Sequence, residues 1–159
     1  MRGWGLSVQI WLLAATLVAV AGSATFHVVV EPAAAHDAIL LRRKIMKAVG
    51  NAAKEASEMA KGQRAFDAKR AASHMSLVAH SWEELAKLFP AGSESGARTR
   101  AAPEVWTNFA DFEAQGSRMS ADAIKAGAAA AEGAEAFARA FEPVATSCKE
   151  CHKTYMTRD

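Results

Sequence analysis

The chain has 159 residues, about the size of one domain, and its 19 Lys and Arg nearly balance 17 Asp and Glu. The formal charge is only +2, and no basic block suited to a phosphate backbone is present, which argues against nucleic acid as a partner. Alanine and charged residues dominate, prolines and glycines number only 4 and 10, and β-branched residues are sparse after residue 50. The composition therefore predicts an all-α fold.

The N-terminus has the three-part layout of a secretory signal. One arginine, Arg2, precedes an uncharged run that begins at Leu6, and small residues follow up to Ala24. We predict export with cleavage after Ala24, and a second small-residue site ends at Ala35. The uncharged stretch over residues 3–30 is long enough to span a bilayer, so an uncleaved membrane anchor is the alternative. Removing residues 1–24 leaves 18 basic against 17 acidic residues.

Apolar residues at three- and four-residue steps predict two helices in the first half of the remaining chain. The first covers residues 36–61, with Asp37 as its N-cap or first-turn charge and Gly62 after its end. The second begins at Asp67 and extends to Pro90. A stretch rich in Gly and Ser, residues 91–101, then predicts a surface loop.

Two further helices are expected after this loop. The third starts at Pro103 and runs to about Ala126, and the fourth carries apolar residues from Phe137 to Tyr155, with Pro143 as a kink or as its true start. Four helices joined by short links predict one antiparallel up-down-up-down four-helix bundle over residues 36–159.

The only two cysteines, Cys148 and Cys151, lie three residues apart, and His152 follows at once. Distant pairs for a disulfide framework do not exist. In a C-x-x-C-H sequence, two thiols one helical turn apart can each bond a vinyl group of haem, and the histidine can reach the iron. A redox dithiol would need a βαβ setting and a zinc site would need further ligands, and the sequence shows neither. The motif therefore predicts one haem c held by two thioethers.

A C-x-x-C-H near the end of a small exported four-helix chain resembles the cytochrome c prime family, the class II c-type cytochromes. Three other segments carry the same resemblance: Arg42-Arg43-Lys44-Ile45-Met46, Lys61-Gly62-Gln63 leading to Phe66-Asp67, and Pro103-Glu104-Val105-Trp106. It covers about residues 38–156. The resemblance implies that the covalently bound haem lies near the C-terminal helix.

The resemblance also implies roles for residues of the first helix. Met46 would face the open side of the iron as its sixth ligand, one turn after Arg42. Arg42, with Arg43 as a rival, would pair with a haem propionate through its two-pronged donor geometry. The pattern from Arg42 to Gly50 is similar to the low-spin branch of the family, whose members resemble electron carriers. Gly50 is expected to relieve crowding near the haem or a neighbouring helix, and packing of Met46 beside the iron without a bond is the alternative.

We therefore predict a periplasmic electron carrier that cycles between Fe(II) and Fe(III) with His152 and Met46 as axial ligands and redox proteins as partners. The alternative is a five-coordinate haem that binds NO or CO. Met156 stands where many gas-binding relatives have Lys or Arg, which favours electron transfer. The position of Met46 offers no distal histidine, so we expect no enzyme. A homodimer through the first two helices is a family expectation, and the remaining histidines are expected at the surface or at interfaces.

Overall fold

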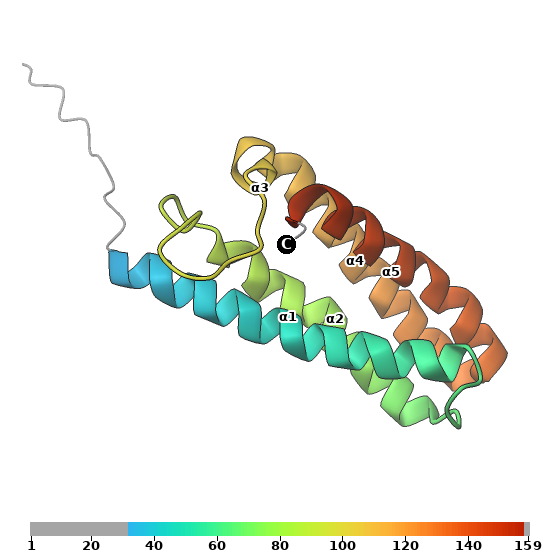
Figure 1. Ribbon diagram of the computed structural model, residues 1–159. Helices are drawn as coiled ribbons and strands as arrows, with labels where there is room; N and C mark the ends of the chain where they lie inside the picture. The colour runs from blue at the N-terminus through green and yellow to red at the C-terminus, as the bar shows by residue number, and fades with distance from the viewer. Residues whose placement is uncertain (1–31, 158–159) are drawn as a thin grey trace, which may run out of the picture.

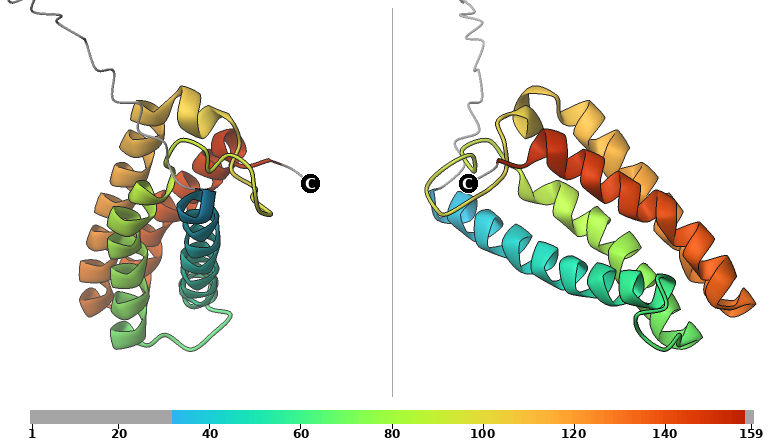
Figure 2. Two further views of the ribbon diagram at one scale, coloured as in Figure 1. Left: turned by 90° about the vertical axis from the view of Figure 1, so that its left-hand side faces the viewer. Right: turned by 45° about the vertical axis from the view of Figure 1, so that its right-hand side comes forward.

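A computed structural model of the protein describes residues 32–157. Within this range the elements are α1 Pro32–Ala60, α2 Ala68–Leu85, η1 Ala86–Leu88, α3 Glu104–Thr107, α4 Phe109–Ala129, η2 Ala130–Glu132 and α5 Ala134–Tyr155. The four long helices alternate in direction and form an up-down-up-down bundle (Figures 1 and 2), so the all-α four-helix prediction is confirmed. The predicted leader, residues 1–24, lies outside the described residues. No helix in residues 32–157 is long and apolar enough to cross a membrane.

Helix α1 begins earlier than the sequence suggests. Its first turn starts at Pro32 and contains no acidic residue, so the prediction of Asp37 as N-cap or first-turn charge was wrong. Proline suits this place because its missing N–H would have no helical partner there, and the alanines that follow have the highest helix propensity. At the other end, Gly62 has φ +68°, and the N–H of Gln63 donates to the carbonyl of Glu58 at 2.8 Å. Glycine therefore ends α1 as predicted.

Helix α2 begins where its sequence pattern indicates. Asp67 is the N-cap, and its side chain accepts from the backbone N–H of Arg70 at 3.0 Å. The predicted apolar stripe lies in the core. Its buried members are Ala71, Met75, Val78, Trp82 and Leu85.

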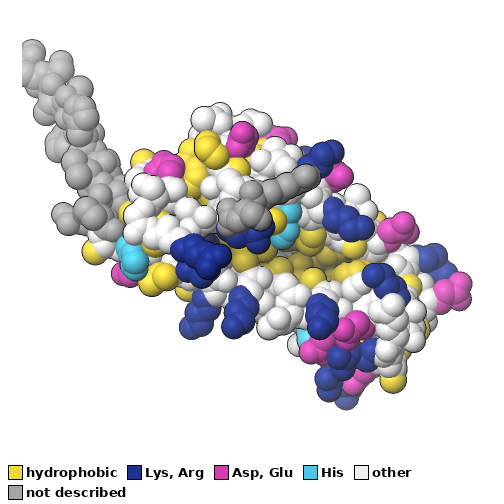
Figure 3. Space-filling view, in the orientation of Figure 1, with side chains coloured by type: hydrophobic (Ala, Val, Ile, Leu, Met, Phe, Trp, Pro, Cys, Tyr) yellow, Lys and Arg dark blue, Asp and Glu magenta, His cyan; other side chains and the backbone are white. Residues whose placement is uncertain are grey.

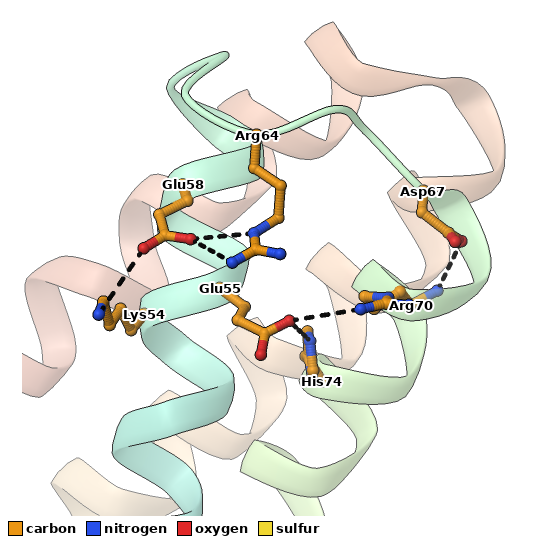
Figure 4. A network of polar contacts seen from close by, with 7 residues as sticks. All are labelled: Lys54, Glu55, Glu58, Arg64, Asp67, Arg70 and His74. Atoms are coloured by element: carbon orange, nitrogen blue, oxygen red, sulfur yellow. Dashed lines mark hydrogen bonds and ion pairs between the residues drawn. The ribbon is translucent and has the colours of Figure 1, made fainter.

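A network of polar contacts ties α1 to α2 near the turn that joins them (Figure 4). Glu55 Oε2 lies 3.3 Å from His74 Nε2 and 3.8 Å from an Arg70 nitrogen. The hydrogen bond from His74 is the main reason that the pKa of Glu55 is lowered. Glu58 pairs with Arg64 of the turn at 2.8 Å. His74 is therefore an interhelical partner, as expected of an interface group.

The third predicted helix is broken at Asn108. The backbone there leaves the helical region, with φ −134° and ψ 47°, and separates α3 from α4. The prediction of one continuous helix was therefore wrong, and the Asn108 side chain makes no capping hydrogen bond at the break. After the break, Phe109 is 37% exposed and does not join the core. Before it, the indole N–H of Trp106 donates to the carbonyl of Phe89 at 3.1 Å.

The link between α4 and α5 also differs from expectation. Helix α4 continues past Gly127, and the chain turns at Gly133, where φ is +112°. Helix α5 then starts at Ala134 and continues through Pro143, which is exposed. Helix α4 therefore ends slightly later than the predicted Ala126, and the alternative in which Pro143 starts the last helix was wrong. Gly133 adopts the positive φ that suits a helix-ending turn, and Gly127 does not.

The buried apolar side chains form two clusters. The first cluster occupies much of the bundle length and includes Val49, Met75, Phe137 and Val144. The second cluster is smaller and contains Trp82, Leu85, Val105, Phe112 and Tyr155. Three half-buried side chains contact both clusters, namely Ile45, Met46 and Met119.

Two glycines in the long helices have opposite surroundings. A Cβ added at Gly116 would overlap the indole ring of Trp82, so the contact between α2 and α4 requires glycine here. Gly50 has no atom within 4 Å of an added Cβ. The expectation that Gly50 relieves crowding against a neighbouring helix was therefore wrong for the described residues, whereas relief of crowding near the haem stays a prediction.

Candidate functional site

The two cysteines lie on the inward face of α5. Both are free thiols and both are half-buried. Cys148 packs against the first cluster and Cys151 against the second. Since α5 is helical throughout this region, the spacing of three residues places both sulfurs on one face, one turn apart.

The thiols lie in apolar surroundings. Burial raises the pKa of Cys148. Burial, with smaller effects of Cys148 and Asp111, raises the pKa of Cys151 to about 11. A reactive redox dithiol has a lowered pKa, so these two thiols do not resemble one. Neutral sulfurs against apolar side chains suit covalent bonds to a flat hydrophobic group.

His152 follows Cys151 on α5 and reaches the surface. The surrounding protein lowers the pKa of its imidazole by desolvation, and the positive charge of Arg100 lowers it further. Neutral imidazole is the form that binds a metal ion. In Figure 3, an apolar furrow lies between α1 and α5, and a histidine side chain borders it.

Met46 lies on α1, on the side of the bundle opposite to α4. Its half-buried side chain contacts both apolar clusters, the same two that receive Cys148 and Cys151. Sequence reasoning singled out this methionine from its position after Arg42. Met119 of α4 also contacts both clusters. No sequence signal indicates the placement of Met119, because it arises from packing between helices.

Arg42 is buried, with 4% of its surface exposed, whereas Arg43 is exposed. Its terminal nitrogens donate to Ser93 O at 2.7 Å and Thr99 Oγ1 at 2.7 Å, and also to Leu88 O at 3.1 Å and Ser93 Oγ at 3.1 Å. Burial lowers the pKa of the guanidinium, and the charge of Glu94 opposes this effect. Both terminal nitrogens therefore already donate hydrogen bonds to the connection between α2 and α3. The pairing of Arg42 with a haem propionate stays a prediction.

Sequence reasoning missed a polar group at the base of the second cluster. The hydroxyl of Tyr155 donates to Asp111 Oδ2 at 2.6 Å, and the Gln115 side chain donates to the same oxygen at 2.8 Å. These bonds, the one from Tyr155 first, lower the pKa of Asp111. The sequence signal that could have indicated this group is Asp111 itself, a carboxylate directly before Phe112, which is buried.

The donors along this furrow suit haem c. Two thiols and an imidazole come from α5, and two thioethers from α1 and α4 pack against the same apolar clusters as the thiols. Residues 32–157 contain no cluster of three or more His, Cys, Asp or Glu that could hold a metal ion. Sulfur and imidazole with an apolar wall are the groups that protein haem sites use.

Comparisons with known proteins agree with this chemistry. A family model described as cytochrome c' matches residues 37–156. Cytochrome c' of Pararhodospirillum photometricum is 35% identical over 116 residues, which are 72% of this chain and 91% of that protein. Cytochrome c-556 of Agrobacterium tumefaciens (strain II Chrys) is 30% identical over 114 residues, which are 72% of this chain and 92% of the relative.

Solved structures show the same fold. Cytochrome c' from Rhodopseudomonas palustris superposes with a TM-score of 0.73 at 28% identity, covering 77% of this chain and 98% of that one. A nitric oxide complex of a variant of cytochrome c' from Alcaligenes xylosoxidans superposes with a TM-score of 0.69 at 25% identity, covering 78% of this chain and 97% of that one. The chain therefore belongs to the cytochrome c' family, and its cofactor is covalently attached haem c.

Proposed function

We propose that the protein is an electron carrier whose haem is tethered by Cys148 and Cys151 and ligated by His152 and Met46. The observation that carries this proposal is the packing of Met46. Its side chain contacts the same two clusters that receive the cysteines, so α1 offers a thioether opposite the attachment face of α5. The protein carries out no catalytic conversion in this role.

Each residue has a distinct part in this function. Haem c supplies the reversible one-electron change between Fe(II) and Fe(III). His152 offers a neutral nitrogen donor, and Met46 offers a sulfur that favours Fe(II) and raises the reduction potential. The apolar clusters exclude water from the haem face, and the helices hold both axial donors on separate rigid elements. Fixed donors keep the reorganisation between oxidation states small.

The first test is the spectrum of the wild-type holoprotein. A His/Met pair gives a ferric low-spin spectrum with a weak long-wavelength band from sulfur to iron, and the ferrous form binds CO poorly. A five-coordinate, high-spin wild type that takes up CO readily contradicts the proposal.

The second test compares two methionines that have the same packing. Met46→Ala should convert the iron to high spin, open it to CO and NO, and lower the reduction potential. Met119→Ala is the matched control, because Met119 is also half-buried and contacts both clusters. It should keep the low-spin spectrum. The opposite result would assign the ligand to α4.

The alternative function is binding of NO or CO at an open coordination position. It is favoured by the similarity to the cytochrome c' from Alcaligenes xylosoxidans whose solved structure is a nitric oxide complex. In that case Met46 packs over the iron without a bond. The wild-type spectrum distinguishes the two functions.

We also propose periplasmic residence and a homodimer. Residues 1–24 have the layout of an export signal, with an uncleaved anchor as the alternative. Helices α1 and α2 expose Leu41 and Leu77, at 46% and 41%, and Leu77 lines a shallow hollow together with Ile45 and His80. Cytoplasmic expression of a chain lacking residues 2–24 should yield little holoprotein in a bacterium whose haem-attachment machinery is periplasmic. For the homodimer, sedimentation of the holoprotein should give the mass of two chains.

A further inference from the structure

The segment between η1 and α3, residues 89–102, crosses from one wall of the bundle to another. We name it the strap. Figures 1 and 2 show it leaving the end of α2, passing the N-terminal half of α1 and continuing beside the C-terminal end of α5. It contains no helix, yet Ser93 is fully buried within it. A surface loop was predicted here, and a buried polar side chain shows that the strap also packs inward.

One end of the strap is anchored on α1 by Arg42. Its guanidinium donates to three strap oxygens, Ser93 O, Ser93 Oγ and Thr99 Oγ1, at 2.7, 3.1 and 2.7 Å. The cation also lies over two aromatic rings, 4.8 Å from the centre of Phe89 and 5.5 Å from that of Trp106. A buried cation with this many partners fixes the strap strongly, because loss of the cation would leave several acceptors unsatisfied.

The other end of the strap is anchored on the last turn of α5. The N–H of Ala102 donates to Tyr155 O at 3.0 Å, and the N–H of Thr157 donates to Arg100 O at 2.9 Å. An isolated antiparallel bridge joins Ala101 to Met156. These contacts hold residues 155–157, which begin three positions after His152 in the chain.

A single oxygen links the two anchors. Thr99 Oγ1 accepts from Arg42 at 2.7 Å and from the N–H of Ala101 at 3.2 Å. Ala101 is the strap residue that bridges to α5. A path of hydrogen bonds and strap backbone therefore runs from Arg42 through Thr99 and Ala101 to the bonds that Ala102 and Arg100 make at the end of α5. Direct packing between α1 and α5 is less extensive than that between α4 and α5, so the strap adds a substantial connection.

From this geometry we infer that Arg42 is a positioning residue that, through the strap, fixes the distance between the Met46 side of α1 and the His152 turn of α5. Met46 follows Arg42 by one helical turn, and Tyr155 follows His152 by three residues. The inference rests on the proposed His/Met function for its consequence at the iron. The strap itself stands on contacts that do not involve the haem.

The first experiment measures hydrogen exchange of the holoprotein in segments 99–103 and 155–157. Arg42→Gln should accelerate exchange in both segments by roughly tenfold, since local opening sets the rate at these amides. Thr99→Val should do so by a smaller factor, whereas Thr99→Ser, which keeps the hydroxyl, should match wild type. Arg43→Gln is the control, because it removes the same charge from an exposed neighbour. Unchanged exchange at 155–157 in both Arg42→Gln and Thr99→Val overturns the inference.

The second experiment measures the iron. Arg42→Gln and Thr99→Val should weaken the sulfur-to-iron band, increase the high-spin fraction and speed CO binding, with Thr99→Ser and Arg43→Gln close to wild type. If Arg42→Gln yields no holoprotein, the comparison of Thr99→Val with Thr99→Ser carries the test, and equal exchange at 155–157 in those two variants refutes it. A five-coordinate wild type with faster exchange at 155–157 in the variants supports the strap and contradicts the His/Met function. A wild type with His/Met ligation whose variants show unchanged exchange at 155–157 supports the His/Met function and contradicts the role of the strap.

Discussion

The contact between Gly116 and Trp82 gives a stability prediction with an internal control. A Cβ at Gly116 would overlap the six-membered ring of Trp82, a side chain that is 7% exposed. Trp82 packs against Phe112 with ring centres 5.2 Å apart, and Phe112 packs against Tyr155 at 5.1 Å. Displacement of the indole would therefore disturb the packing of the second cluster, to which Trp82 belongs. We expect Gly116→Ala to destabilise the protein and Gly50→Ala to stabilise it.

The magnitude follows from two opposing effects. Alanine in a helix interior is favoured over glycine by about 1 kcal/mol. Inserting a methyl group into a packed core costs roughly 1–3 kcal/mol, and the overlap with a rigid indole places Gly116→Ala at the upper end. The net loss should be about 2 kcal/mol, which lowers Tm by roughly 6–8 °C for a domain of this size. Gly50→Ala gains the propensity alone and should raise Tm by about 3 °C.

Urea unfolding of the ferric holoprotein, followed by far-ultraviolet circular dichroism, measures both variants. Near-ultraviolet spectra should change for Gly116→Ala, because the ring packing moves, and should remain constant for Gly50→Ala. A Gly116→Ala protein as stable as wild type would refute the reasoning, since α2 and α4 could then separate or Trp82 could rotate at no cost.

Three other predictions concern Tyr155 and Asp111. Tyr155→Phe should lower the free energy of unfolding by about 1 kcal/mol through loss of the bond to Asp111, and the effect should largely vanish in an Asp111→Ala background, which has no acceptor. The pKa of Asp111 is below its ordinary value of 3.8, so the stabilisation by the ionised carboxylate is complete above pH 3.8 and is lost as the pH falls through the pKa of the folded protein. Asp111→Asn should therefore flatten the decline of the urea midpoint in acid. The pKa of Tyr155 is raised to about 12 from 10.0, so the stabilisation by the neutral phenol is complete below pH 10 and is lost as the pH rises towards 12. Because Tyr155 is the only tyrosine, ultraviolet titration should show phenol ionisation well above pH 10. Ionisation at pH 10 in the folded protein would contradict the burial of the Tyr155 hydroxyl.

The elements that depend on local sequence could be predicted. The apolar period located all four long helices. Gly62 ends α1 and Asp67 begins α2, as local capping rules require. The haem motif was predictable for the same reason, because Cys148, Cys151 and His152 lie within five consecutive residues. Their chemistry follows from a spacing that one helix fixes by itself.

The features that depend on distant residues could not be predicted. Arg42 and Ser93 are 51 positions apart, and only the folded chain shows that they form a buried hydrogen bond. The break at Asn108 follows from the packing of Trp106 over the end of the bundle, since its local sequence permits a continuous helix. The similar placement of Met46 and Met119 likewise arises only where helices meet.

The boundary between the two apolar clusters has a consequence for how the chain accommodates its cofactor. The side chains that join the clusters are two unbranched methionines and one isoleucine, whereas the clusters themselves contain rings and β-branched groups. A thioether chain changes rotamer at low energetic cost, so two of the three side chains at this boundary can adapt their shape. Rotation of these side chains would make room for a rigid macrocycle with less disturbance than a shift of the helices, whose close contact between Trp82 and Gly116 leaves little space.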